Sequence, residues 1–244
     1  MTARHGLPPE CVAWCRSQDP DLVVLDDIAP VDLDWWNYGL ADRGIPVLLS
    51  GRDLDGATVT AGRAFLRRGD VVGSLGDEAS DDDLAVLFRA AAWLMDHPRR
   101  RHRRVFPEVM APAAGGEGLE LSTILSGLRW CREFHPRTEA VAPRGSSWTG
   151  WPPMPGVGQS LRSLYLWAVH PGANRPQLID EYSLASMCRH GWGEVPSIPR
   201  FTRRRYSRYC DQLHAWASEA GVPTELVEMW LFGNWWHHAG GVSQ

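Results

Sequence analysis

The chain has 244 residues, of which 44% are hydrophobic and 22% are charged, and its formal net charge is −4. These values are typical of a globular protein with a buried core, and the length fits one large domain or two small ones. No apolar run reaches the roughly 18 to 20 residues that span a bilayer, and the first residues lack the apolar core of a secretory signal. We therefore expect a cytoplasmic protein.

The reactive side chains of the sequence exclude several kinds of chemistry. Five cysteines are scattered along the chain, which favours reduced thiols over a disulfide framework. No cysteine or histidine spacing matches a metal site, so no metal is expected. The chain contains no lysine, and every strongly basic side chain is an arginine. A lysine Schiff base is thus excluded as a covalent intermediate.

Residues 1–80 are predicted to form an irregular or mixed region that packs on the main domain. Residues 21–28 and 45–50 are rich in aliphatic side chains and have the composition of short strands or packed extended segments. Residues 32–40 contain a tryptophan pair and are predicted to form a short helix. Several glycines in residues 61–78 indicate frequent turns.

The remaining residues, 81–244, are predicted to form a helical domain, so the fold class is mostly α. Apolar residues recur at helical spacing, Pro98 ends the first helical segment, and Gly221 ends a later one. The predicted helices cover residues 83–97, 119–134, 158–169, 181–190, 202–220 and 224–238. A long connection rich in proline and glycine separates the second of these helices from the third.

A short glycine turn, Met-Pro-Gly-Val-Gly at 154–158, precedes the predicted helix at 158–169. Glycine can adopt positive φ and leaves neighbouring backbone N–H groups uncovered. Such N–H groups at the start of a helix bind anions, and a DNA phosphate is the expected anion. The predicted phosphate-binding residues are Gly156, Val157, Gly158 and Ser160.

Two neighbouring carboxylates, Asp180 and Glu181, follow a pair of aliphatic residues at the start of the next predicted helix. A carboxylate at a helix N-terminus is stabilised by the helix dipole and stays ionised. Asp180 lies 20 positions after Ser160. The segment 178–190 is therefore predicted to be a helix start that carries a functional carboxylate.

Together, these two motifs resemble those of the helix–hairpin–helix DNA glycosylase superfamily. That family has a Leu-Pro-Gly-Val/Ile-Gly hairpin, followed by an aliphatic-Asp-x-x-aliphatic motif with the catalytic aspartate. The run at 206–232 also resembles bacterial proteins with the 8-oxoguanine DNA glycosylase fold. The resemblance covers about 119–232 and implies a helix–hairpin–helix glycosylase-like fold, with the hairpin motif at about 150–170.

The resemblance implies a DNA N-glycosylase that flips out and excises a damaged or modified base, in DNA repair or in defence against phage. Bifunctional members carry a catalytic lysine where this chain has Ser160, so the implied activity is monofunctional. Asp180 and Glu181 are both candidates for the catalytic acid. The preceding aliphatic pair favours Asp180, whereas the spacing to Leu184 favours Glu181.

A flipped base needs aromatic walls, and four tryptophans near the motifs are candidates: Trp148, Trp151, Trp235 and Trp236. Each of them is also compatible with an ordinary core position. Arg203, Arg204 and Arg208 are candidates for contacts with the DNA backbone, or for solvated surface charge.

The expected partner is double-stranded DNA that carries a modified base. No cofactor is required, although the resemblance allows a monovalent cation on the backbone carbonyls of the hairpin. Two other functions remain open. The first is a catalytically inactive helix–hairpin–helix DNA-binding protein, and the second is a helical protein-interaction domain with an aromatic-rich N-terminal surface.

Overall fold

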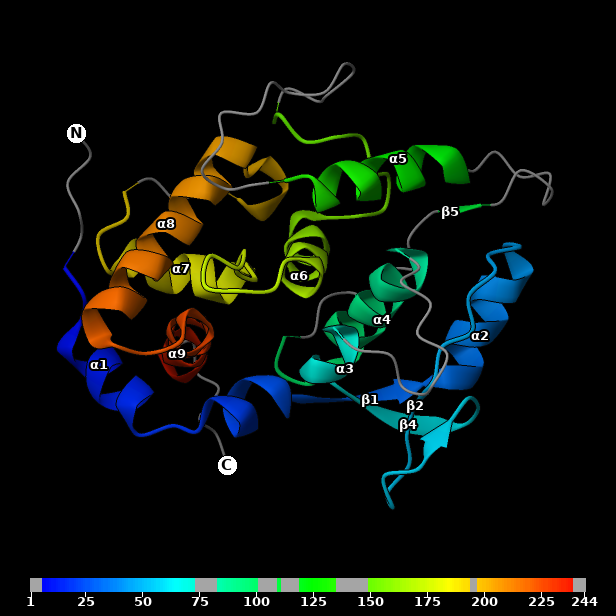
Figure 1. The fold of residues 1–244 in the computed structure, drawn as a ribbon, viewed down its shortest axis with the longest axis horizontal. Helices are drawn as coiled ribbons and strands as arrows, with labels where there is room; N and C mark the ends of the chain where they lie inside the picture. Colours follow the sequence, from blue (N-terminus) through cyan, green and yellow to red (C-terminus); the bar gives the residue numbers. More distant parts are fainter. Residues whose placement is uncertain are drawn as a thin grey trace.

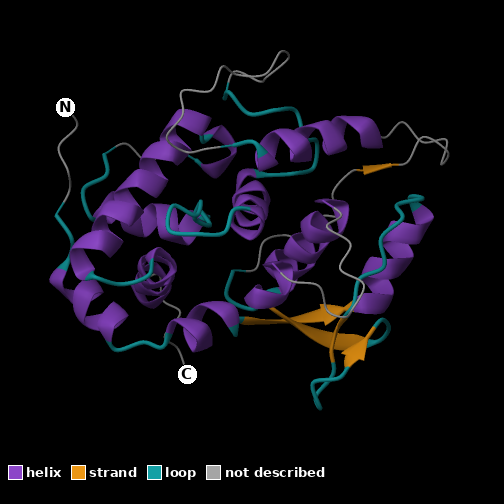
Figure 2. Ribbon diagram, viewed as in Figure 1, coloured by secondary structure: helices purple, strands orange, loops and turns teal. Residues whose placement is uncertain are grey.

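The structure is a computed structural model of the 244-residue chain, and it describes residues 6–72, 83–100, 109–110, 119–134, 149–193 and 197–238. Within these ranges the fold is mostly helical, which confirms the predicted fold class, and a small sheet lies at one side of the helices (Figures 1 and 2). No helix in the described ranges has both the length and the apolar character needed to cross a bilayer.

The N-terminal region contains both helices and strands. It begins with α1 (Pro9–Arg16), the π-helix η1 (Asp21–Leu25), β1 (Ile28–Asp32) and α2 (Leu33–Asp42). Most of the segment predicted at 21–28 as extended is therefore helical. Asp32 caps α2, because its side chain accepts a hydrogen bond from the backbone N–H of Trp35 at 3.1 Å.

Strand β1 belongs to a four-stranded antiparallel sheet. Its other strands are β2 (Gly51–Arg52), β3 (Thr58–Val59) and β4 (Arg63–Arg67), and the strand order is β1-β4-β2-β3. Residues 45–50 do not form a strand, although Ile45 and Leu49 are buried in the core. The short helix α3 (Arg68–Val72) leads out of the sheet.

Six further helices follow along the chain: α4 (Asp83–Asp96), α5 (Leu121–Arg132), α6 (Gln159–Val169), α7 (Glu181–Arg189), α8 (Arg203–Ala220) and α9 (Thr224–His238). A one-turn 3-10 helix, η3 (Ile198–Arg200), and two paired strands of two residues, β5 (Val109–Met110) and β6 (Leu119–Glu120), complete the described elements. Gly221 ends α8 in the left-handed conformation with φ 68°, as the sequence indicated.

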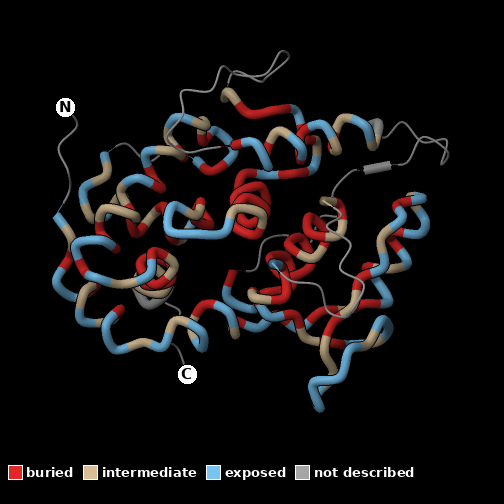
Figure 3. The backbone as a smooth tube through the Cα atoms, in the orientation of Figure 1, coloured by how far each residue is buried: buried red, intermediate tan, exposed pale blue. Residues whose placement is uncertain are grey.

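Helix α6 lies at the centre of the molecule, and its residues from Gln159 to Ala168 are all buried (Figure 3). It packs against α4, which in turn covers β1. Helix α1 packs against α9 and α8, so the N-terminal region shares the helical core. Both motifs of the sequence border this core: the glycine turn lies directly before α6, and Ile179, which precedes Asp180, is hydrogen-bonded to Ser163 in the first half of α6.

Candidate active site

The glycine turn lies directly before α6. Gly156 has φ 73°, and the backbone N–H of Val157 donates to the carbonyl of Met154 at 3.0 Å, which closes the turn. Gly158 is the N-cap of α6 and has no side chain to occupy the first N–H groups of the helix. Within the predicted motif range of 150–170, only α6 is helical, and the residues before it form turns or irregular backbone, so no helix precedes the turn in this range.

The four predicted phosphate-binding residues differ in exposure. Gly156 and Gly158 are exposed, whereas Val157 and Ser160 are buried and offer a ligand only their backbone groups. Beneath the turn, the buried Arg162 directs Nη2 toward the carbonyl oxygen atoms of Pro152 and Val157, each at 3.5 Å. A buried cation thus supports the turn from inside.

Asp180 is the N-cap of α7, and a capping box fixes its backbone and its side chain. Its Oδ1 accepts the backbone N–H of Ser183 at 2.7 Å, and the hydroxyl of Ser183 accepts the backbone N–H of Asp180 at 3.0 Å. The preceding residue, Ile179, donates its backbone N–H to the hydroxyl of Ser163 on α6 at 3.0 Å. The carboxylate is therefore positioned by two helices.

The second oxygen of Asp180 belongs to a buried network of four charges. Arg100 Nη1 donates to Asp180 Oδ2 at 2.6 Å and lies 2.8 Å from Glu228 Oε1. Glu228 Oε2 accepts from Arg68 Nη1 at 2.7 Å, and none of the four side chains is exposed. Burial would lower the pKa of Arg100, but the charges of Glu228 and Asp180 raise it above its usual value. The network therefore pairs two cations with two anions.

Glu181 is the first residue of α7 and is exposed to solvent. The two candidate acids thus have opposite environments: Asp180 is buried and paired, whereas the Glu181 side chain is open to a ligand that approaches from outside. Neither residue lines the cavity of about 890 Å³ between α1 and α9 that is described below.

The candidate tryptophans whose side chains the structure describes do not line a base pocket. Trp151 is 2% exposed, donates Nε1–H to the carbonyl of Phe201 at 3.1 Å, and packs against the ring of Tyr206. It therefore belongs to the aromatic core. Trp235 is half-buried on α9 and does not line the cavity. Trp148 and the side chain of Trp236 lie outside the described residues.

The candidate DNA-contacting arginines lie at the start of α8. Arg203 is partly buried, and its backbone N–H donates to the carbonyl of Thr149 at 2.9 Å, which ties α8 to the segment before the glycine turn. Arg204 and Arg208 are exposed and lie four residues apart, so they share one face of the helix. This face is available for contacts with phosphate.

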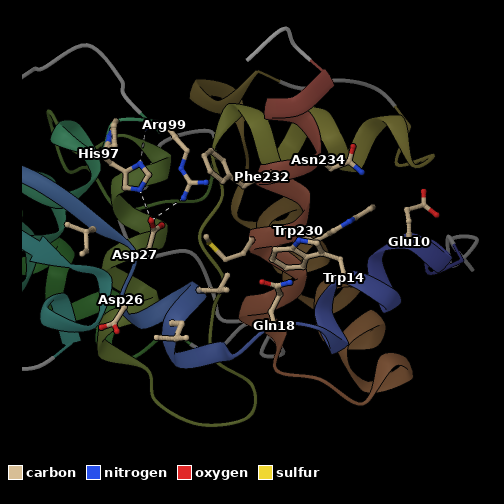
Figure 4. A pocket seen from close by; sticks show the side chains of 16 residues that line it. Glu10, Trp14, Gln18, Asp26, Asp27, His97, Arg99, Trp230, Phe232 and Asn234 are labelled. Atoms are coloured by element: carbon tan, nitrogen blue, oxygen red, sulfur yellow. Dashed lines mark hydrogen bonds and ion pairs between the residues drawn. The ribbon is translucent and has the colours of Figure 1, made fainter. Parts of the chain in front are cut away.

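A cavity of about 890 Å³ lies between α1, η1, the end of α4 and α9. Trp14 and Trp230 contribute aromatic side chains at one end of its wall, and Phe232 lies with the polar groups of Asp27 and His97 at the other end (Figure 4). Sequence analysis identified none of these residues. The only signal was that the Asp26–Asp27 pair follows four consecutive apolar residues.

His97 and Asp27 form a buried pair at this cavity. His97 Nδ1 accepts the backbone N–H groups of Arg99 at 3.2 Å and Arg100 at 3.0 Å, so Nε2 carries the proton and donates to Asp27 Oδ1 at 2.9 Å. Burial lowers the pKa of His97, and although the hydrogen bond to Asp27 and its charge oppose this, the nearby charges of Arg100 and Arg99 also lower the pKa. Burial would raise the pKa of Asp27, but the His97 hydrogen bond and the nearby positive charges lower it.

The cavity and the charge network share a wall. Met229 and Phe232 line the cavity on one side. On the other side, Arg100 Nη2 lies 3.0 Å from the Met229 sulfur, and its guanidinium carbon lies 4.0 Å from the centre of the Phe232 ring. Arg100 therefore contacts both Asp180 and two residues of the cavity wall. No cluster of three or more potential metal ligands occurs among the described residues.

Comparisons with curated proteins and with solved structures gave no match. A family model described as "Putative 8-oxoguanine DNA glycosylase OGG-like protein" matches residues 24–232, which include the sheet, the glycine turn, Asp180 and most of α9. The match covers most of the 244 residues, so the chain belongs to this family of OGG-like proteins, whose description suggests a DNA glycosylase.

Proposed function

We propose that this protein is a monofunctional DNA N-glycosylase that removes a modified base from double-stranded DNA. One observation carries the proposal beyond family membership. In a chain of the OGG-like family, a carboxylate is fixed at the N-terminus of α7 by the capping box and by Arg100. A preorganised negative charge is what this reaction requires.

Cleavage of the N-glycosidic bond leaves positive charge on the deoxyribose as the base departs. A fixed carboxylate beneath the sugar stabilises this charge and orients the water that attacks C1′. The C1′–N bond breaks, a C1′–O bond forms, and the base leaves with a proton. Without lysine in the chain, no lysine Schiff base forms and the abasic strand stays intact. Removing the carboxylate should reduce the rate about a hundredfold or more.

The catalytic acid is Asp180 or Glu181, and the two require different events. Asp180 must separate from Arg100, because its oxygen atoms are both occupied and buried. Glu181 is already exposed and needs only a rotation of its side chain. We favour Asp180, since its position is fixed by α6 and α7 while that of Glu181 is not.

The DNA backbone would lie across the glycine turn and the exposed face of α8. The N–H groups at the start of α6, which no side chain caps, suit a phosphate, and Arg204 and Arg208 add positive charge. A monovalent cation fits this turn poorly, because the carbonyl groups of Pro152 and Val157 already face the Arg162 guanidinium. The proposed reaction therefore uses no cofactor.

A strand-scission assay tests this function. Duplexes with a single 8-oxoguanine, alkylated purine, uracil or glucosylated hydroxymethylcytosine are incubated with the protein and then heated in alkali. We expect cleavage of at least one duplex only after alkali, abolished in Asp180→Asn and retained in Glu181→Gln. The reverse pattern would assign Glu181. The duplex that is cut separates repair of damage from defence against modified phage DNA.

A second function, DNA binding without catalysis, is favoured by the ion pair between Arg100 and Asp180. This pair neutralises the candidate acid and excludes water from it. Under this alternative, no duplex is cut, while salt-sensitive binding to DNA persists. Cleavage that depends on either carboxylate would eliminate it.

A further inference from the structure

The cavity between α1 and α9 contains a carboxylate that the proposed reaction does not use. Asp27 lines the cavity, its side chain is 5% exposed, and its Oδ1 is bonded to His97 and approached by Arg99. Its other oxygen, Oδ2, is buried and makes no hydrogen bond with any described residue. A buried oxygen of this kind loses its hydration without compensation, a cost that folded proteins usually avoid through a donor from the protein, an ordered water or a ligand.

The orientation of this carboxylate is fixed from behind. Because His97 Nδ1 accepts two backbone N–H groups, Nε2 must be the donor toward Asp27 Oδ1. The carbonyl of Asp27 also accepts Nε1–H of Trp93 at 2.8 Å, which holds the backbone. Oδ1 is thus committed to the protein, and Oδ2 is the oxygen left for a ligand.

The Arg99 side chain shows which kind of chemical group suits the space beside Asp27 and Phe232. Its Nη2 lies 3.4 Å from Asp27 Oδ1, and its guanidinium carbon lies 5.6 Å from the centre of the Phe232 ring (Figure 4). A guanidinium is flat and donates N–H groups in its plane, as the edge of a nucleobase does. The interaction with Asp27 is long and the side chain is 49% exposed, so Arg99 can give way to a ligand with the same features.

We propose that this cavity binds a nucleobase whose Watson–Crick edge carries an N–H donor, and that Asp27 is the residue that recognises this donor. The inference rests on the proposed function, because the bound base is the one that leaves the DNA stack. A flipped base is read through its Watson–Crick edge, which points away from the sugar and so enters the cavity first. This edge meets Asp27, while Trp14, Trp230 and Phe232 offer faces for stacking.

The proposed site would distinguish a base with an N–H group on its Watson–Crick edge from one that lacks this hydrogen. An N–H group satisfies Asp27 Oδ2, whereas an N–CH₃ group at the same position places a methyl against a buried carboxylate. Hydrogen bonds to a charged partner are strong, and leaving a buried charge unsatisfied is costly. We therefore expect methylation of the edge nitrogen to weaken binding about ten- to hundredfold.

The first test uses the unmodified protein and free nucleosides. Calorimetric titrations compare 2′-deoxyinosine, which has one N–H on this edge, with 1-methyl-2′-deoxyinosine, which has none. We expect deoxyinosine to bind at least about tenfold more tightly. Equal affinities, or no binding of deoxyinosine at millimolar concentration, would overturn the inference.

The second test reverses the preference with Asp27→Asn. Because His97 keeps donating, the asparagine must turn its oxygen toward His97 and its NH₂ into the cavity. This variant should prefer 2′-deoxynebularine, whose N1 is an acceptor, over deoxyinosine. Asp26→Asn is the matched control: Asp26 also lines the cavity but is paired with Arg67 at 2.9 Å, so its replacement should leave the preference unchanged. The same response in both variants would remove the role of Asp27.

These titrations do not depend on base excision, so the two ideas fail separately. A donor preference that follows Asp27, in a protein that cuts no duplex, would retain the recognition site and reject the glycosylase. Duplex cleavage that depends on Asp180 or Glu181, without any preference between the two nucleosides, would retain the glycosylase and reject Asp27 as the recognition residue.

Discussion

Arg100 donates a hydrogen bond to Asp180 at 2.6 Å across 80 residues of sequence, and neither side chain is exposed. The interaction joins the segment after α4 to the start of α7, and Glu228 of α9 lies against the same guanidinium. The negative charge of Asp180, which caps α7, is thus neutralised by Arg100 inside the protein. Any chemistry at Asp180 must first disturb this balance, so the stability of the fold and the availability of the acid are linked.

Arg100→Met should therefore be strongly destabilising. The substitution leaves the carboxylates of Asp180 and Glu228 buried, with only Arg68 as a cation, and breaking a buried pair in this way costs about 3–5 kcal/mol. Urea unfolding followed by circular dichroism measures the change in unfolding free energy. Arg67→Met is the control, because Arg67 pairs with Asp26 at the surface, where a pair contributes at most about 1 kcal/mol. Equal destabilisation by both substitutions would contradict the buried network.

Local signals in the sequence predicted the features that depend on neighbouring residues. The helical segments were recognised from apolar periodicity, and each boundary lies within a few residues of its prediction. Gly221 ends α8 because glycine adopts the left-handed conformation without strain. Asp180 caps α7 because its side chain reaches the N–H of Ser183. The resemblance of the two motifs predicted the activity of a DNA glycosylase, and the family match supports this prediction.

The features that sequence reasoning missed depend on contacts between distant residues. Asp27 and His97 are 70 positions apart, and Arg68 and Glu228 are 160 apart. Charged residues are expected at the surface, so nothing in their local sequence indicates a buried network. Trp151 was proposed for a base pocket from its position near the turn, but its ring is enclosed by other aromatic side chains. Only the three-dimensional packing distinguishes these cases.

The glycine turn provides a test at two neighbouring positions. Gly156→Ala should cost about 1–2 kcal/mol of folding stability, because φ is 73° and an alanine is strained there. Gly158→Ala should cost less than about 1 kcal/mol, since φ is −66° and an added Cβ meets no atom within 4 Å. Urea unfolding of both variants gives the comparison. A larger effect of Gly158→Ala would be inconsistent with the described turn.

The buried His97 should make the fold sensitive to acid. Its pKa is lowered from the usual 6.5, so below about pH 6.5 the unfolded chain binds a proton that the folded protein does not. The free energy of unfolding should therefore decrease as the pH falls from about 7.5 toward about 5. His97→Gln keeps a donor for Asp27 and does not titrate, so its unfolding free energy should vary less over this range. Urea midpoints at several pH values measure both slopes, and equal slopes would exclude His97 as the source.

The exposed arginines of α8 should control the salt dependence of DNA binding. Each neutralised phosphate contributes about −0.9 to the slope of log K against log salt concentration, so replacing Arg204 and Arg208 with glutamine should make the slope shallower by about 0.9 for each phosphate that they neutralise. Arg63→Gln is the control, because this exposed residue lies on β4, away from α8 (Figure 1). Fluorescence anisotropy with an unmodified duplex measures the slopes. Only an arginine that contacts a DNA phosphate should change the slope when it is replaced. If Arg63→Gln therefore changes the slope as much as the Arg204 and Arg208 replacements do, the DNA does not bind specifically to the exposed face of α8.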